Sequence, residues 1–461
     1  MSFDPERAEI RFGCGLSPRI APPVSVDDMM ARLTGPDRIA AALPIPDYDA
    51  YRPRMSEVHA IKKVQKNGRT EDERQAAYKT YIKLRRKTRA DAAGWMGQMM
   101  LRRALTEDGL RERLVSFWAD HFTARGNGRI WPQGQLPYIE QAIRPHVSGR
   151  FGDMLRAAAL HPLMVKYLDQ SKSIGPNSAV ARKQGKRAGL NENLAREMLE
   201  LHTLGVEGPY EQADVQALAR ILTGVTFKLK HGFVYAKKQA EPGPHVLLGH
   251  RFGAKKPKLK HIHDALDMLA THPATAGHIA HKMAVHFVSD TPDPGMVADM
   301  TVAFSATNGD LAAVTRVMLE HPAAWADGPR NVKRPIDFIG SAMRALDVVP
   351  RQVPTKKPKD MRALILAPLT LMGQPLEAPP GPDGWPESDA DWITPQRLAA
   401  RLQWAMAAPY RLTKVLPRPE DFARAALGGT LPEPVRFAAA SAETRAEGIG
   451  LVLASPAFQR V

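Results

Sequence analysis

The chain has 461 residues and a formal net charge of +16, with 44% hydrophobic and 24% charged residues. This composition is that of a globular protein, so a wholly disordered chain and a collagen are excluded. No apolar run approaches the roughly 18 residues that a membrane-spanning helix needs, which excludes a membrane bundle. The single cysteine, Cys14, excludes an intramolecular disulfide and a cysteine-rich zinc site.

The beginning of the sequence is acidic and has no positively charged segment followed by an apolar stretch. Because a secretory signal peptide needs that order of segments, the sequence favours the cytoplasm as the location. We therefore expect no transmembrane segment and no signal peptide.

Residues 52–89 hold 13 Lys or Arg against four acidic residues, within a basic helical segment expected over 52–105. Such a cluster is the electrostatic signature of a surface that binds a polyanion. No nucleic-acid-binding motif accompanies it, and few aromatic residues interleave for base stacking, so a nucleic-acid partner is disfavoured. The alternative is a solvated helix face without a partner.

Three His-Pro pairs, at 161–162, 272–273 and 321–322, indicate helix boundaries because proline starts or stops a helix. Between them, apolar residues recur with helical periodicity. The clearest row is Ile279, Met283 and Phe287, which are four residues apart and share one helical face. The sequence predicts a mainly α protein, built as one large helical domain over residues 1–461.

One small β-hairpin is predicted near residues 225–236. Apolar and polar side chains alternate from Val225, and a turn that contains Gly232 separates this stretch from a second apolar one.

Residues 374–395 contain six prolines together with Trp385 and Trp392. So many prolines argue against a helix, and the two tryptophans favour an ordered loop that packs on the body.

The densest polar sequence lies at residues 189–206. Asn191 or Asn193 is expected to cap a short helix that Gly205 ends. The apolar positions expected on its inner face are Leu194, Met198 and Leu201. Because charged and amide side chains stand among these apolar residues, each polar group must find a partner in the fold.

Glu197 and Glu200 are three residues apart, so they could hold one cation or divide into a general acid and a general base. His202 and the distant His121 could complete a metal shell or transfer protons. The spacing matches neither the Glu-x-x-His pairs of a di-iron bundle nor the His-Glu-x-x-His of a zincin, so a divalent metal stays an alternative. The competing interpretation is a buried salt-bridge and capping network in which Arg196 neutralises Glu200.

Other polar and aromatic side chains are candidates for holding a substrate. They are Asn191, Asn193, Arg196, Asp169, Arg220 and Trp385. The aromatic face of Trp385 suits a sugar ring, although the same residue could simply anchor its proline-rich loop. His278, His281 and His286 do not share one tight face with an acid, so we expect them at solvated or partly buried positions on a helix.

The 191–206 segment also closely resembles the signature of a bacterial family, domain of unknown function 1800. Further stretches resemble the family in the same order along the chain, at 11–15, 117–122, 167–169, 214–224, 333–335 and 383–386. Asp120 stands where members often have Asn, which places a carboxylate beside His121.

The resemblance implies a large, predominantly helical protein without an established activity. It implies export for many members, which makes the periplasm the alternative location. It also implies a partner, because the genes often lie beside a second family that carries twin-arginine signals and resembles sulfatases.

Three hypotheses follow from the sequence. The first is an enzyme, of hydrolase or lyase type, that acts on a glycan or other polyanionic substrate through Glu197, Glu200, His202 and His121. The second is a non-catalytic binding or assembly protein that works with an envelope partner. The third is a nucleic-acid binder that uses the basic region.

Overall fold

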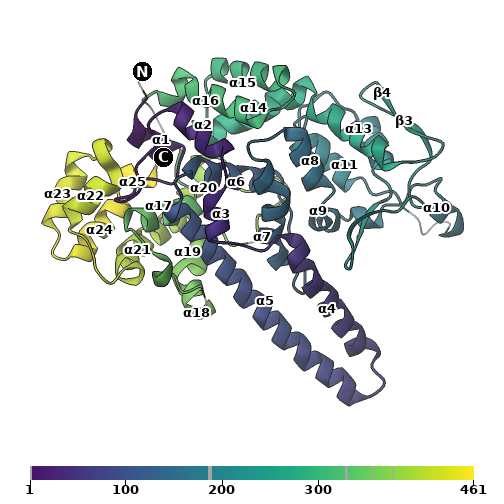
Figure 1. Cartoon of the computed structure of the whole chain (residues 1–461), viewed down its shortest axis with the longest axis horizontal. Coiled ribbons are helices and arrows are strands. Elements are labelled where there is room, and N and C mark those ends of the chain that lie inside the picture. Colours follow the sequence, from purple (N-terminus) through teal and green to yellow (C-terminus); the bar gives the residue numbers. More distant parts are fainter. Residues whose placement is uncertain (1–2, 185–188, 328–330, 356, 377) are drawn as a thin grey trace.

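The computed structural model describes residues 3–184, 189–327, 331–355, 357–376 and 378–461. Helices dominate these residues, which confirms the predicted fold class. Figure 1 shows a wide helical body from which one pair of long helices projects. In the described part of the chain, no helix is both long and apolar enough to cross a membrane.

The helices in the first half of the chain are α1 (Pro5–Arg11), α2 (Val26–Thr34), α3 (Arg38–Ala42), α4 (Tyr48–Asn67), α5 (Glu71–Leu105), α6 (Gly109–His121), α7 (Gln135–Tyr138), α8 (Phe151–Ala159), α9 (Pro162–Tyr167), α10 (Ala179–Gln184), α11 (Asn193–Glu197) and α12 (Gln212–Ile221). Within the described residues, three π-helical turns interrupt the α-helices, and they are η2 (Ile139–Ile143), η6 (Met198–His202) and η9 (Arg362–Leu366).

The helices after the strands are α13 (Leu259–Ala270), α14 (Pro273–Phe287), α15 (Pro294–Ala306), α16 (Leu311–Glu320), α17 (Pro335–Ala345), α18 (Pro358–Met361), α19 (Ala367–Leu371), α20 (Asp389–Trp392), α21 (Pro395–Leu412), α22 (Pro419–Leu427), α23 (Glu433–Ser441), α24 (Arg445–Ala454) and α25 (Pro456–Gln459).

Each of the three predicted His-Pro boundaries begins a helix, and the histidine is the capping residue. The ring Nδ1 of His161 accepts a hydrogen bond from the backbone N–H two residues later at 3.1 Å. His272 and His321 make the same bond at 3.1 and 3.2 Å. Burial lowers the pKa of His161 to about 3, so its ring stays neutral and can accept. The imidazole thus serves where Ser or Asp usually caps a helix.

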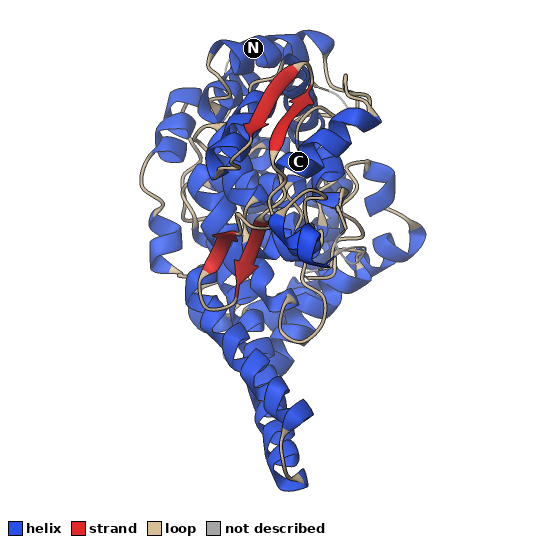
Figure 2. Cartoon of the chain, turned by 90° about the vertical axis from the view of Figure 1, so that its right-hand side faces the viewer, coloured by secondary structure: helices blue, strands red, loops and turns tan. Residues whose placement is uncertain are grey.

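The strands form two separate antiparallel hairpins, which Figure 2 shows on the same side of the molecule. The first pairs β1 (Val225–Lys228) with β2 (Gly232–Tyr235) and confirms the predicted hairpin. The second, β3 (Gly243–Leu247) with β4 (His250–Ala254), corrects the expectation of a single hairpin. Its turn residues Leu248 and Gly249 have φ of 49° and 78°, the conformation that a two-residue hairpin loop needs.

The proline-rich segment 374–395 forms an ordered loop against the body, as predicted, with residue 377 outside the described residues. Trp392 is buried, and its ring lies 6.3 Å from that of Trp385. The expectation that prolines prevent any helix here was wrong for the single turn α20, because its four residues contain no proline.

Buried apolar side chains gather in two clusters. The first runs from Ala8 to Trp325 and the second from Ala93 to Phe458. Helix α5 contributes Tyr81 to the first and Met96 to the second, so this one helix passes through both.

Helices α4 and α5 form the projecting pair. At its base, Tyr48, Tyr51 and Met55 are buried in the first apolar cluster. The part farther from the body, residues 60–89, is called the outer hairpin below, and it extends away from the body as a stalk (Figures 1 and 2).

Candidate functional site

The helix predicted from the 189–206 segment is present, but it changes type halfway. The side chain of Asn191 accepts a hydrogen bond from Asn193 N–H at 2.8 Å, one residue before the N-cap at Glu192. Helix α11 then continues into the π turn η6, where Thr203 Oγ1 donates to the Met198 carbonyl at 2.7 Å. π turns are rare and occur frequently at functional sites.

The π turn changes which side chains face the core. An ideal α-helix would bury Leu201 in line with Leu194, as the sequence predicts. The wider turn instead buries Leu199 and His202, and Leu201 is only half-buried. The predicted inner face is therefore correct at Leu194 and Met198 and wrong at Leu201, which lies within the π turn.

The exposed edge of this helix carries a small ion network. Arg196 lies 3.2 Å from the Glu200 carboxylate and 3.6 Å from that of Glu192, and it donates to Gln212 at 2.8 Å. Because these side chains are partly in water, the network adds little stability. It does neutralise Glu200, as the structural interpretation of the sequence required.

Glu197, the next residue in the same helix, is half-buried. Burial raises the pKa of its carboxyl group, and the nearby carboxylates of Glu200 and Asp383 raise it further. Asp383 comes from the proline-rich loop, nearly two hundred residues farther along the chain.

A tyrosine lies next to the carboxylates of Glu197 and Asp383, and an arginine lies next to the tyrosine. Burial raises the pKa of Tyr167, at the end of α9, and the charges of Glu197 and Asp383 add to the shift. The Arg125 guanidinium lies 6.0 Å from the Tyr167 ring centre and donates to the Pro379 carbonyl at 2.7 Å. Four separate segments therefore meet around the Glu197 carboxyl group.

Three histidines lie directly beneath the helix. His121 and His202 are 2% and 1% exposed, and their ring centres are 6.1 Å apart, while His278 is 6.3 Å from His121. Nε2 of His121 donates to the His202 carbonyl and Nε2 of His278 donates to the Leu201 carbonyl, both at 3.2 Å. These bonds hold the carbonyls that the π turn leaves without a helical partner.

Burial keeps the three rings neutral. It lowers the pKa of His202 to about 3 and that of His278 to about 4, and the positive charge of Lys282 adds to both shifts. The pKa of His121 is lowered well below its usual range for the same two reasons. The predicted role of His121 and His202 in proton transfer stays a prediction, and both rings are closed off from solvent.

A buried ion network lies next to the histidines and was not predicted. Arg334 lies 2.6 Å from the Asp120 carboxylate and 2.8 Å from that of Glu387, and His286 is 3.0 Å from Glu387. The backbone N–H of Trp385 donates to Asp120 at 2.8 Å. We call these four side chains, Asp120, His286, Arg334 and Glu387, the buried ion network.

Charges within the network shift the pKa values of its two carboxyl groups in opposite directions. Burial would raise the pKa of Glu387, but the charges of Arg334 and His286 hold it far below its usual range. Burial raises the pKa of Asp120 despite the same arginine, and the charge on Glu387 adds to the increase. Three members of the network, Asp120, His286 and Arg334, line a cavity of about 110 Å³ together with Trp385.

Lys282 lies between the histidines and the buried ion network. Burial lowers its pKa, while the charges of Asp120 and Glu387 oppose the decrease. His278, Lys282 and His286 are four residues apart on α14, beside the apolar row that starts at Ile279. This polar row was the signal that sequence reasoning overlooked when it compared His278 with His281 instead.

The remaining predicted residues are scattered. Asp169 has a left-handed backbone (φ 57°), pairs with Lys172 at 2.9 Å, and its carbonyl accepts from Asn191 at 3.4 Å. Arg220 instead lies near His245 of β3, whose pKa its charge helps to lower after burial. Among the described residues, no hydrogen bond or ion pair joins Arg220 to the other predicted site residues.

In the residues that the structure describes, no group of three or more His, Cys, Asp and Glu is arranged to hold a metal ion. The rings of His121 and His278 are bound to backbone carbonyls, and the carboxylates of Asp120 and Glu387 are bound to Arg334.

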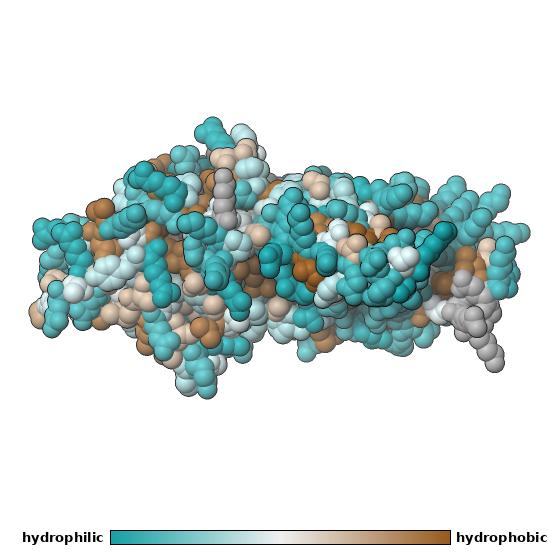
Figure 3. All heavy atoms as spheres, turned by 90° about the horizontal axis from the view of Figure 1, so that it is seen from below, coloured by the Kyte–Doolittle hydropathy of each residue, from teal (hydrophilic) through white to brown (hydrophobic). Residues whose placement is uncertain are grey.

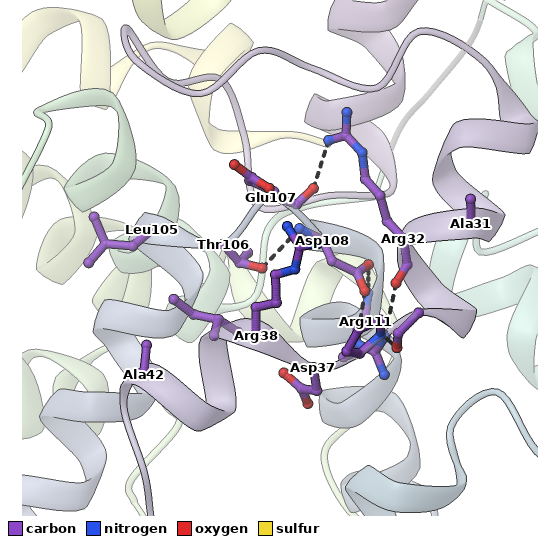
Figure 4. Close-up of a pocket in the computed structure, with 13 residues that line it drawn as sticks. Ala31, Arg32, Asp37, Arg38, Ala42, Leu105, Thr106, Glu107, Asp108 and Arg111 are labelled. Carbon is purple, nitrogen blue, oxygen red and sulfur yellow. Dashed lines mark hydrogen bonds and ion pairs between the residues drawn. The ribbon is translucent and has the colours of Figure 1, made fainter.

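A separate cavity of about 500 Å³ lies between α2, α3 and the start of α6 (Figure 4). Most of its charged side chains are already bonded within the protein. Arg111 donates to Asp108 and to the carbonyls of residues 32, 33 and 35, and Arg32 donates to the Glu107 carbonyl. None of the predicted site residues lines this cavity.

The fold and the site together define a helical protein with an acidic group above buried neutral histidines and a buried ion network. The chain belongs to the family described as protein of unknown function (DUF1800), which matches residues 11–460. No curated protein and no solved structure matches the chain.

Proposed function

We propose that the protein is an enzyme of hydrolase or lyase type in which the Glu197 carboxyl group is the general acid. The observation that carries this is the half-buried Glu197, whose pKa is raised by burial and by the two carboxylates beside it. A raised pKa favours the protonated form of a carboxyl group, which is the form that donates a proton to a leaving group.

The neighbouring residues fit distinct roles in such a reaction. Glu200, paired with Arg196, supplies the second carboxylate that acid–base chemistry needs. Asp383 maintains the raised pKa of Glu197. His121 acts as a positioning residue, because its ring donates to the His202 backbone carbonyl at the end of the helix. His202 is proposed to act through its buried ring beside that of His121.

The proposed substrate is a glycan or another polyanion. Arg125 lies beside Tyr167, and Arg196 precedes Glu197 on the same helix. Both guanidinium groups are candidates for holding an anion. Asn191, Asn193, Asp169 and Trp385 lie on the surrounding segments and remain the candidates for substrate contacts. Arg220 is the candidate that its position beside β3 supports least.

The test compares two single variants on a panel of chromogenic glycosides and anionic polysaccharides. Hydrolysis is followed by new reducing ends, and a lyase reaction by its unsaturated product. Glu197→Gln should lose on the order of 100-fold in turnover, the usual contribution of a general acid. Glu207→Gln, at an exposed position beyond the helix, should match the wild type. Turnover that survives Glu197→Gln, or a panel that the wild type leaves unchanged, would overturn the proposal.

The deep burial of His121 and His202 and of the buried ion network favours a second candidate function. Here the protein is a non-catalytic binding or assembly protein, and its characteristic residues maintain a rigid surface for an envelope partner. In that case Glu197→Gln should change no activity and should instead raise the melting temperature, because it removes a charge that burial disfavours.

A further inference from the structure

We propose that the outer hairpin, residues 60–89, is a binding site for the surface of an anionic phospholipid membrane. This inference is independent of the proposed enzymatic function and of the residues around Glu197. It starts from the charges of the outer hairpin and from the apolar side chains between them.

The outer hairpin carries a row of exposed cations that the protein itself does not use. Within the described residues, eight exposed Lys or Arg side chains make no ion pair with an acidic side chain. They are Lys63, Lys66, Arg69, Lys79, Lys83, Arg86, Lys87 and Arg89. An exposed cation without a partner contributes little to folding, and it remains available to an external anion.

The three acidic residues of the outer hairpin, Glu71 to Glu73, are confined to its tip, and two of them are engaged there. Glu73 accepts a hydrogen bond from the Arg69 backbone N–H at 2.7 Å, and Glu71 pairs with Arg74 at 2.7 Å. Both bonds stabilise the first turn of α5. The shaft is therefore positive along its length, and it would contact an anionic surface along its side rather than at its tip.

Apolar side chains lie between the cations. Val64, Tyr78 and Ile82 are 47%, 46% and 37% exposed. Tyr78 and Ile82 are four residues apart on α5, with Lys79 and Lys83 directly beside them. Viewed from the side toward which the hairpin points, the surface is mostly hydrophilic with apolar atoms in between (Figure 3).

This combination favours a membrane over a nucleic acid. At a membrane surface, cations attract anionic headgroups while Tyr and Ile enter the boundary of the acyl chains. Nucleic acid would need aromatic faces for stacking, but Tyr78 is the exposed aromatic side chain of the outer hairpin, and Tyr81 is buried. Exposed Val64 and Ile82 would find no apolar surface on a phosphate backbone.

The experiment measures sedimentation of the full-length protein with vesicles of phosphatidylcholine alone or mixed equally with phosphatidylglycerol. The wild type should bind only the mixed vesicles, and binding should weaken as salt is added. The combined variant Lys79→Gln, Lys83→Gln, Arg86→Gln should bind on the order of 100-fold more weakly, since each cation near an anionic surface contributes about fivefold.

The matched control removes three exposed lysines elsewhere, with Lys255→Gln, Lys256→Gln and Lys258→Gln. It changes the net charge equally and should bind like the wild type. A second hairpin variant, Tyr78→Ser with Ile82→Ser, should also weaken vesicle binding while leaving all charges in place. Thermal melting of each variant confirms that it is folded.

Two results would overturn the membrane assignment. In the first, the wild type fails to bind the mixed vesicles, or the control loses as much binding as the hairpin variant. In the second, duplex DNA binds more tightly than vesicles, with an affinity that depends on Lys79, Lys83 and Arg86 but not on Tyr78 and Ile82. The second result would assign the hairpin to nucleic acid.

Discussion

The buried ion network and the outer hairpin use positive charge in opposite ways. Arg334 is almost wholly buried and lies between two carboxylates, at 2.6 and 2.8 Å. The eight cations of the outer hairpin are exposed, and none of them has a carboxylate partner among the described residues. The ion pairs of Arg334 hold the segments that carry Asp120, Arg334 and Glu387 together. The unpaired cations of the outer hairpin instead produce a positive potential in the surrounding solvent.

The difference shows that the excess positive charge, +16 in total, is not spread evenly over the protein. A buried cation needs carboxylates around it, because an unpaired charge away from water is costly. An exposed cation has no such requirement, so an excess of cations can accumulate only where the chain projects into solvent. The comparison predicts that equal substitutions in the two regions have very unequal effects.

The largest effect is expected at Arg334. Arg334→Met leaves the carboxylates of Asp120 and Glu387 buried without a countercharge, which should lower the free energy of unfolding by about 3–5 kcal/mol. Arg86→Met on the outer hairpin should change it by less than about 0.5 kcal/mol. Urea unfolding of both variants measures the difference. An equal decrease in the free energy of unfolding of the two variants would show that the buried and the exposed cation contribute alike.

The histidines beneath α11 should make the body sensitive to acid. The pKa of His202 is about 3 in the folded protein, below the usual value of 6.5, so its stabilising contribution is complete above pH 6.5 and is lost as the pH falls. Between pH 7 and pH 5 the unfolded chain gains a proton that folded His202 does not. The wild type should therefore lose about 2 kcal/mol more stability over this range than His202→Leu.

A nearby apolar substitution provides the control for this pH dependence. Leu194→Ala, also fully buried in the same helix, removes packing but no titrating group. It should cost about 2–5 kcal/mol equally at both pH values. If His202→Leu and the wild type lose the same stability between pH 7 and pH 5, His202 is not held neutral by burial.

Local patterns explain which parts of the fold could be predicted from the sequence. The helical periodicity, the three His-Pro boundaries and the first hairpin depend on residues close in sequence, and all of them are found. The second hairpin was missed because Pro244 interrupts the strand-like pattern of β3. The single turn α20 was missed because prolines around it concealed a short gap without proline.

The candidate site was predictable only in part, for physical reasons. The Arg196–Glu200 pair follows directly from its i, i+4 spacing. The π turn could not be predicted, because the spacing of Leu194, Met198 and Leu201 also fits an uninterrupted α-helix. The partners of Arg334 are separated from it by long stretches of chain, and a single sequence carries no local signal for such contacts.

Gly205 tests whether the π turn depends on its backbone conformation. Its φ is 89°, and a Cβ there would lie 3.0 Å from Nδ1 of His278. Gly205→Ala should therefore cost about 1–2 kcal/mol, the penalty for a left-handed residue, with further crowding of the histidine. Gly277→Ala, in the interior of α14 with open space around its Cβ position, should instead stabilise the protein slightly. Thermal melting distinguishes the two, and equal shifts would argue against a strained turn.

The smallest effect is expected inside the outer hairpin, where a cation has an aromatic partner instead of a carboxylate. Nζ of Lys62 lies 3.8 Å from the ring centre of Tyr81, which is buried between α4 and α5. A double-mutant cycle with Lys62→Met and Tyr81→Leu should give a coupling energy of about 0.5–1 kcal/mol. A value of several kcal/mol would mean that the hairpin, like the buried ion network, depends on a specific charge. A small value would mean that the two helices are held by apolar packing at the base, so that the charges of the shaft are free for an external surface.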